Sequence, residues 1–212
     1  MIRAIVYDFD GVICDSVNVK TAAFAEMYES YGEEVVANVV AYHLANGGVS
    51  RFEKFKYYSK HLLGKNISEE EVIVLSSRFS DLVKQKVIQS SYINGAYSFL
   101  TKHAKSNYQF ICTGTPETEI IEILNARKIS SYFTYIYGSP KTKDKILEII
   151  MNDYLLEKSE ILFIGDAMTD YRAAITTGVS FVGILNDATK FPIGTITIKD
   201  FTDSKLQSLL IN

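Results

Sequence analysis

The 212-residue sequence has only three prolines and two cysteines, and no low-complexity tract interrupts it. It also lacks an apolar stretch of the roughly 18 residues that a membrane-spanning helix needs, because charged or polar residues punctuate each apolar run. The 22 basic and 25 acidic residues are interspersed, so no broad basic surface is available to neutralise a nucleic-acid backbone. We therefore expect neither a membrane nor a nucleic acid as a partner.

The cysteines and the first residues favour a cytoplasmic location. Cys14 and Cys112 do not have metal-type spacing, and in a reducing compartment both are expected to be free thiols. The opening segment MIRAIVYDFDG passes from one arginine through a short apolar run into carboxylates, without a small-residue cleavage site. This pattern is typical of a β-strand and not of a signal peptide.

Short apolar runs predict strands that are buried on both faces of a parallel sheet. These runs span residues 2–8, 108–113, 133–138, 160–166 and 180–185. Between the later runs, helix-type spacing of apolar residues covers 117–127 and 142–154. The alternation predicts an α/β fold with a doubly wound, Rossmann-like parallel sheet, and such sheets bind ligands at the carboxyl ends of their strands.

Residues 17–90 interrupt this alternation with helix-type spacing throughout. Ser68 and Glu71 have the spacing of a capping box and predict the start of the last of four helices. We interpret the segment as a helical cap domain of residues 16–91. It would be inserted into an α/β core domain made of residues 1–15 and 92–212.

Polar elements follow four of the predicted strands. They are Asp8 with Asp10, Thr113 with Gly114, Lys143, and Asp166 with Asp170. Taken alone, each has a structural explanation as a turn, a helix cap or a solvated lysine. Because the carboxyl ends of parallel strands meet at one edge of a sheet, we expect these residues to converge. Four carboxylates beside one lysine repel one another unless a cation is bound, which favours a magnesium site.

These elements, with the sequences DFDGV and GDAMTD, resemble the four ordered motifs of the haloacid dehalogenase superfamily. The helical insert after the first motif is similar to the C1-capped branch (subfamily I) with phosphoglycolate phosphatase and β-phosphoglucomutase-like members. The resemblance covers essentially the whole chain. It implies a Mg²⁺-dependent phosphatase that acts on a small phosphorylated metabolite, such as a sugar phosphate or a phosphoglycolate-like compound.

The resemblance also implies a role for each carboxylate. Asp8 would be the nucleophile that forms an aspartyl-phosphate. Asp8, the backbone carbonyl of Asp10, and Asp166 would hold Mg²⁺, with Asp170 as an occasional ligand. Asp10 would first protonate the leaving oxygen and then activate water. We expect its side chain to face like charge, which would raise its proton affinity.

The remaining motif residues are expected to bind the phosphoryl group and the substrate. Thr113, the Gly114 amide and Lys143 would bind phosphate oxygens. In the insert, Gly47–Arg51 has the sequence GGVSR and resembles a cap loop in which the arginine contacts substrate. Arg51, with Lys54, would bind a second anionic group, whereas the alternative interpretation is a serine N-cap followed by solvated cations.

Several functions stay open on the same core. A β-phosphoglucomutase-like mutase is one alternative, although Gly165-Asp166 followed by Asp170 favours hydrolysis. A phosphonate hydrolase would need a reactive lysine in the cap, and the sequence does not distinguish Lys54 from its neighbours. A non-catalytic phosphosugar-binding protein would be expected to have lost a motif carboxylate. The second acid at Asp10 counts against halide displacement, and the chain is expected as a monomer or a homodimer.

Overall fold

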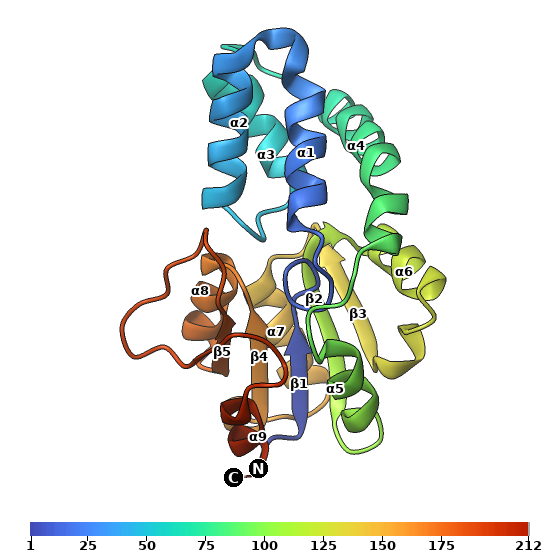
Figure 1. Ribbon diagram of the computed structural model, residues 1–212, viewed down its shortest axis with the longest axis vertical. Helices are drawn as coiled ribbons and strands as arrows, with labels where there is room; N and C mark the ends of the chain where they lie inside the picture. Colours follow the sequence, from blue (N-terminus) through green and yellow to red (C-terminus); the bar gives the residue numbers. More distant parts are fainter. Residues whose placement is uncertain (212) are drawn as a thin grey trace.

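The computed structural model describes residues 1–211 and places a parallel sheet at the centre of the α/β part (Figure 1). Within those residues the sheet has six strands in the order β3-β2-β1-β4-β5-β6. The strands are β1 (Ala4–Tyr7), β2 (Tyr108–Pro116), β3 (Tyr135–Ser139), β4 (Ile161–Gly165), β5 (Ser180–Ile184) and β6 (Thr197–Ile198). The neighbouring strands all pair in parallel, as the continuous apolar runs predicted.

The two faces of the sheet are covered by different helices. Alternate residues of β1 pack on opposite sides, with Ile5 and Tyr7 in one apolar cluster and Ala4 and Val6 in the other. The first cluster includes apolar residues of α5 (Ala96–His103), α6 (Glu117–Ala126) and α9 (Ser204–Ile211). The second includes those of α7 (Lys143–Asp153) and α8 (Met168–Thr177). The predicted doubly wound α/β fold is confirmed.

Three of these elements were not predicted. The sequence analysis did not identify α5, β6 or α9, because β6 is two residues long and each of the two helices has eight residues. The second strand also continues three residues beyond its expected end. Its pairing with β3 is irregular between Cys112 and Pro116 and resumes where Pro116 lies opposite Ser139. The strand end that carries Thr113 and Gly114 therefore extends toward the insert.

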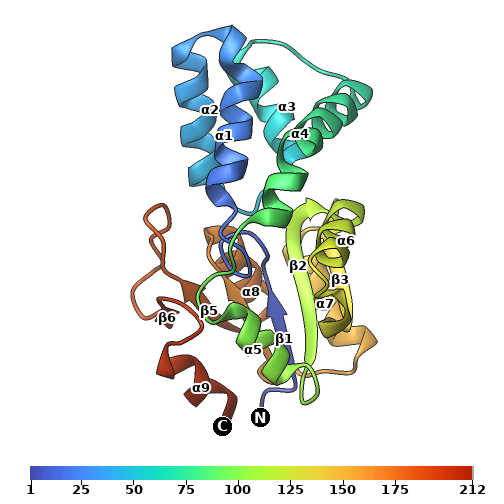
Figure 2. The ribbon, with the colours of Figure 1, turned by 45° about the vertical axis from the view of Figure 1, so that its right-hand side comes forward.

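Residues 17–89 form four helices at the carboxyl ends of the strands, visible at the top of Figures 1 and 2. The helices are α1 (Val17–Tyr28), α2 (Glu33–Ala45), α3 (Arg51–Tyr57), which continues as a π-helical turn, and α4 (Glu69–Gln89). The predicted capping box at the start of α4 is confirmed. The Glu71 amide donates to the Ser68 hydroxyl, and the Ser68 amide donates to the Glu71 carboxylate.

Aromatic side chains from three helices pack the interior of this insert. The ring of Phe24 in α1 lies 5.6 Å from that of Phe55 in α3 and 4.3 Å from that of Phe79 in α4, measured between centroids. Burial of such rings supplies most of the stabilisation of a small helical unit. The division of the chain into a cap domain and a core domain stays a prediction.

The insert joins the sheet through two segments that run side by side. The Asp15 amide donates to the Ser91 carbonyl at 2.9 Å, and the Ile93 amide donates to the Ile13 carbonyl at 3.0 Å. Cys14 lies between these contacts, and it and Cys112 are both buried free thiols, as predicted. Within residues 1–211, no helix combines the length and the apolar character that crossing a membrane requires.

Candidate active site

The polar strand ends converge, as their shared position in the sequence predicted. Asp8 follows β1, Thr113 lies near the end of β2, and Asp166 follows β4. Lys143 is the first residue of α7 and Asp170 lies in the first turn of α8, so two helix starts complete the group. All five of these side chains are less than a tenth exposed.

Asp8 is held from two directions. Its Oδ1 accepts a hydrogen bond from the Phe9 amide at 2.7 Å, and its Oδ2 lies 2.9 Å from Nζ of Lys143. Lys143 also donates to Asp170. Burial lowers the pKa of Lys143, but the charges of Asp170 and Asp8 outweigh this effect and hold it above its ordinary value. Lys143 therefore stays charged beside Asp8.

Asp166 and Asp170 add carboxylates to the same spot. Atoms from Asp8, Asp166 and Asp170 that can bind a metal all lie within 4.8 Å of one another. Burial, followed by the charges of Asp8 and Asp170, raises the pKa of Asp166 well above its ordinary value. Burial also raises the pKa of Asp170 to about 6, although Lys143 acts in the opposite direction. The cluster therefore carries more negative charge than one lysine offsets.

This donor set fits a magnesium ion. Mg²⁺ prefers carboxylate oxygens, and opposite ligands in an octahedral shell with Mg–O distances of about 2.1 Å lie roughly 4.2 Å apart. The spread of the three carboxylates is of this size. A Cβ at Gly11, where φ is +78°, would lie 2.2 Å from Oδ2 of Asp166, so a glycine is needed beside the cluster.

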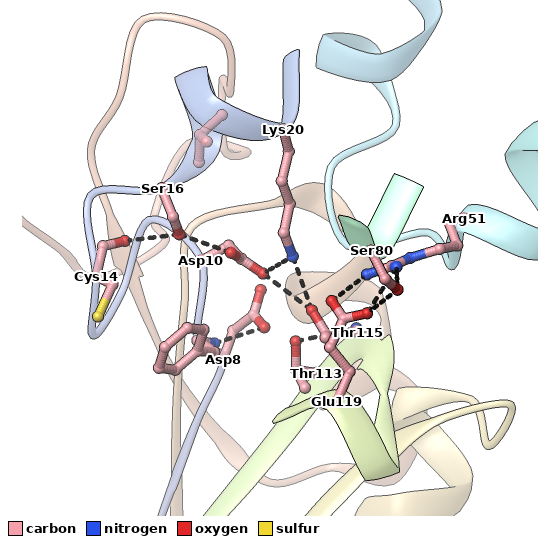
Figure 3. A network of polar contacts seen from close by, with 12 residues as sticks. Asp8, Asp10, Cys14, Ser16, Lys20, Arg51, Ser80, Thr113, Thr115 and Glu119 are labelled. Carbon is pink, nitrogen blue, oxygen red and sulfur yellow. Dashed lines mark hydrogen bonds and ion pairs between the residues drawn. The ribbon is translucent and has the colours of Figure 1, made fainter. Parts of the chain in front are cut away.

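The carboxylate of Asp10 points toward Lys20 and Thr115, and both of its oxygens are paired (Figure 3). It accepts hydrogen bonds from the hydroxyls of Ser16 at 2.6 Å and Thr115 at 3.2 Å, and it forms an ion pair with Lys20. Burial raises the pKa of Asp10, but the charge and hydrogen bond of Lys20, with the two hydroxyls, lower it below its ordinary value. The expectation that like charge raises the proton affinity of Asp10 is therefore wrong, because Lys20 outweighs it.

The partners of Asp10 were missed in the sequence, although two of them carry a signal. Lys20 is the one basic residue of α1 and comes one turn after the helix begins. Thr115 lies two residues beyond Thr113, on the same side of a strand. The Lys20 ammonium also donates to the Thr115 hydroxyl at 2.7 Å, so the first helix of the insert contacts two strand ends.

A glycine loop of the insert lies against Gly114, Lys143 and Thr169. The carbonyl of Gly47 accepts a hydrogen bond from the Thr169 hydroxyl at 2.7 Å. A Cβ at Gly48, where φ is +74°, would lie 2.2 Å from that hydroxyl oxygen and 2.9 Å from Nζ of Lys143. A Cβ at Gly114 would lie 2.4 Å from the Gly48 carbonyl oxygen. This close approach requires glycine on both sides of the contact.

Arg51 lies at the start of α3, directly after the Ser50 N-cap, and its side chain is buried. Its two terminal nitrogens lie 2.8 and 2.5 Å from the two carboxylate oxygens of Glu119 in α6. One of them also donates to the Ser80 hydroxyl of α4 at 2.7 Å (Figure 3). Arg51 thus ties the insert to the α/β part through Glu119, which the sequence analysis missed. Its contact with substrate stays a prediction.

A cavity of about 540 Å³ lies between the strand ends and the insert. From the strand ends it is lined by Asp8, Asp10, Thr113, Gly114 and Asp166, and from the insert by Lys20, His43, Arg51 and Lys54. Cavities of this size hold small molecules. The convergent carboxylates, the charged lysine beside them and the cavity are suited to reactions of small anionic compounds.

The pattern of the haloacid dehalogenase-like hydrolases matches residues 5–184. The chain belongs to this family. It is 28% identical over 200 residues to the phosphoglycolate phosphatase of Photorhabdus laumondii, an alignment that covers 86% of this chain and 80% of that protein. With the hydrolase family and phosphatases among its relatives, the chain is an enzyme, a phosphatase of the haloacid dehalogenase type.

Solved structures of the family share the fold. The β-phosphoglucomutase of Clostridium difficile superposes with a TM-score of 0.80 at 19% identity. The match covers 100% of this chain and 96% of the mutase chain. The hydrolase YfnB of Bacillus subtilis, solved bound to magnesium, has a TM-score of 0.72 at 16% identity and covers 100% and 99% of the two chains. At these identities the likeness concerns the fold alone.

Proposed function

We propose that this enzyme is a magnesium-dependent phosphatase that hydrolyses a small phosphomonoester through an aspartyl-phosphate on Asp8. The observation that carries the proposal is the position of the Asp8 carboxylate. It lines the cavity, 2.9 Å from the Lys143 ammonium and beside the carboxylates of Asp166 and Asp170. A carboxylate held in this way is suited to in-line attack on phosphorus.

In the first half of the reaction, an Asp8 oxygen forms a bond to phosphorus as the bond to the leaving oxygen breaks. Lys143 orients the Asp8 carboxylate and offsets charge on the phosphoryl oxygens. The Thr113 hydroxyl and the Gly114 amide donate to the remaining oxygens. Both residues line the cavity beside Asp8.

The proposed metal ligands are Asp8, the backbone carbonyl of Asp10, and Asp166, with Asp170 nearby. Mg²⁺ bound there supplies a Lewis acid for the phosphoryl oxygens and offsets the excess of carboxylate charge. Burial and neighbouring carboxylates raise the pKa of Asp166, and a bound cation would favour its ionised form. Asp170 accepts hydrogen bonds from the Lys143 ammonium and from the Ala167 amide, and it thereby orients the lysine.

Asp10 transfers protons in both halves of the proposed reaction. It donates a proton to the leaving alkoxide, and it later removes a proton from the water that attacks the aspartyl-phosphate. Paired with Lys20, Asp10 is ionised, which is the form that the second half requires. Lys20 has to release Asp10, and Asp10 has to take up a proton from solvent water, before that carboxyl can act as an acid.

The proposed substrate class rests on the relatives and on the size of the cavity. Phosphoglycolate phosphatases are among the relatives, so a phosphoglycolate-like metabolite or a sugar phosphate is proposed as substrate. In this proposal residues 16–91 form a cap domain over a core of 1–15 and 92–212. The cap excludes water and provides specificity, to which Arg51 contributes by positioning or by contact.

The test is phosphate release by the purified chain from a panel of sugar phosphates and short organic phosphates, with Mg²⁺ and then with EDTA. We expect release that depends on Mg²⁺ and that is lost in the Asp8→Asn variant at unchanged secondary structure. Release that continues in EDTA would contradict the metal assignment. The absence of release from every compound by the folded wild-type chain would contradict the proposed function.

A further inference from the structure

Lys54 on α3 is a buried cation on the insert side of the cavity. Its side chain is 2% exposed, and it lines the same cavity as Asp8 and Asp10. Its Nζ lies 2.8 Å from Nδ1 of His43 and 3.4 Å from the His43 carbonyl oxygen. It also lies 5.7 Å from the centre of the Phe24 ring, on which His43 is packed.

No carboxylate among residues 1–211 lies within ion-pair distance of Lys54. Its neighbours in the cavity wall differ in this respect. Lys20 is paired with Asp10, and Arg51 is paired with Glu119. Asp10 and Glu119 are therefore already paired with other cations, and within the described residues the Lys54 ammonium has no carboxylate partner.

An unpaired ammonium in such a place destabilises the folded chain. Burial, followed by the charge of Lys20, lowers the pKa of Lys54 to about 7. The burial of His43, followed by the charge of Lys54, lowers the pKa of His43 to about 3. The imidazole is therefore neutral, and its Nδ1 can accept a hydrogen bond from Lys54. A hydrogen bond from the ammonium to a neutral ring does not compensate a buried charge, whereas a bound anion does.

We propose that Lys54, oriented by His43, binds a second anionic group of the substrate, so that the substrate class is a phosphorylated acid. This inference rests on the proposed phosphatase function and restricts it. The phosphoryl group lies on the strand side of the cavity at Asp8, and a carboxylate or a second phosphate lies on the insert side at Lys54. A neutral sugar phosphate leaves the Lys54 charge uncompensated.

The cavity supports this assignment by its size and its charges. A volume of about 540 Å³ admits a short phosphorylated acid whose two charged ends reach both walls. Arg51 binds both carboxylate oxygens of Glu119 and is therefore less available to a ligand than Lys54. The residue that recognises the second anion is then Lys54, one helical turn beyond the arginine of the GGVSR loop.

The experiment compares 2-phosphoglycolate with 2-hydroxyethyl phosphate, in which a hydroxyl replaces the carboxylate. Ethylene glycol bisphosphate serves as a third probe that distinguishes a carboxylate from a second phosphate. Phosphate release is measured for the wild type, Lys54→Met and Lys54→Gln, the last of which keeps a donor for His43. Lys56→Met is the matched control, because Lys56 lies on the same helix, is half exposed and is paired with Glu69.

We expect the wild type to prefer an acidic probe and both Lys54 variants to lose about ten- to hundredfold of that preference in KM, as the loss of a charge-assisted contact predicts. Lys56→Met is expected to keep it. Equal KM values of the wild type for all three probes, or a preference retained in both Lys54 variants, would overturn the inference.

Calorimetric binding of 2-phosphoglycolate separates this inference from the proposed function. It is measured with Asp8→Asn and with the Asp8→Asn, Lys54→Met double variant, so that no turnover is needed. We expect binding to be at least tenfold weaker in the double variant. Equal affinity would refute the role of Lys54, whereas weaker binding without phosphate release by the wild type would refute only the phosphatase.

Discussion

Replacing Arg51 by methionine removes the positive end of a buried ion pair that joins the insert to the α/β part of the chain. Both side chains of this pair are nearly inaccessible, with 4% of Arg51 and 6% of Glu119 exposed. In the variant, Glu119 keeps the Ser80 hydroxyl but loses both nitrogens of the guanidinium. A buried carboxylate is then left without a compensating charge.

The expected loss of stability is large. Breaking a buried pair by removing one partner costs about 3–5 kcal/mol. For a chain of this size each kcal/mol lowers Tm by about 2–4 °C, so we expect a decrease of roughly 6–20 °C. The guanidinium also lies 4.6 Å from the centre of the Phe79 ring, and the methionine side chain retains part of that packing.

The effect should depend on pH in a defined direction. Burial raises the pKa of Glu119, but the hydrogen bonds and charge of Arg51 outweigh this and hold it below its ordinary value of 4.5. A carboxyl group whose pKa is lower in the folded chain than in the unfolded chain stabilises the fold at pH values above its unfolded-state pKa. This stabilisation is lost as the pH falls through the folded-state pKa. The difference in Tm between wild type and variant should therefore shrink below about pH 4.5.

The assay is thermal and urea denaturation of four chains. Arg51→Met with Glu119→Leu should recover most of the loss, because removing both charges leaves no unpaired group. Lys84→Met is the control, since Lys84 pairs with Glu122 between α4 and α6 at an exposed site where such pairs contribute at most about 1 kcal/mol. An Arg51→Met chain as stable as wild type, or a double variant no more stable than the single one, would refute the reasoning.

Three further predictions concern the cavity. Asp166→Asn should raise the Mg²⁺ concentration needed for half-maximal phosphate release without lowering Tm in EDTA, and an unchanged Mg²⁺ titration would sink the assignment. Gly48→Ala places a Cβ 2.2 Å from the Thr169 hydroxyl oxygen and should lower kcat/KM at least about tenfold. Gly32→Ala is the control, because Gly32 also has a positive φ but has open space around its Cβ position. Lys54→Met should raise Tm at pH 7 by removing a buried charge. The gain in Tm should shrink as the pH rises toward 10.5, because Lys54 loses its proton in the folded wild type before it does so in the unfolded chain, and the wild type becomes more stable over that range. A constant gain across that range would contradict the linkage.

Much of the fold could be predicted because its signals are local. Strands buried on both faces appear as continuous apolar runs, and the helices that cover them repeat their apolar residues every three or four positions. The capping box at Ser68 needs only two residues three apart. The short elements β6 and α9 give too few residues for a period to be recognised.

The order of the motifs along the chain was also sufficient to predict that Asp8, Thr113, Lys143 and Asp166 converge. Parallel strands place their carboxyl ends at one edge, so a polar residue after each strand joins the same site whatever the length of the connection. The sequence by itself therefore determined the fold class and the residues that meet at the strand ends.

Only the tertiary structure decided how the insert's charges are paired. Lys20 neutralises Asp10, Arg51 is bound by Glu119 in α6, and Lys54 is left with a neutral histidine. These contacts depend on the angle at which the helices pack over the strand ends, and no local period encodes that angle. Because a buried charge is stabilised or destabilised by whichever group lies within a few ångströms, the electrostatics of the cavity could not be known before the insert was placed.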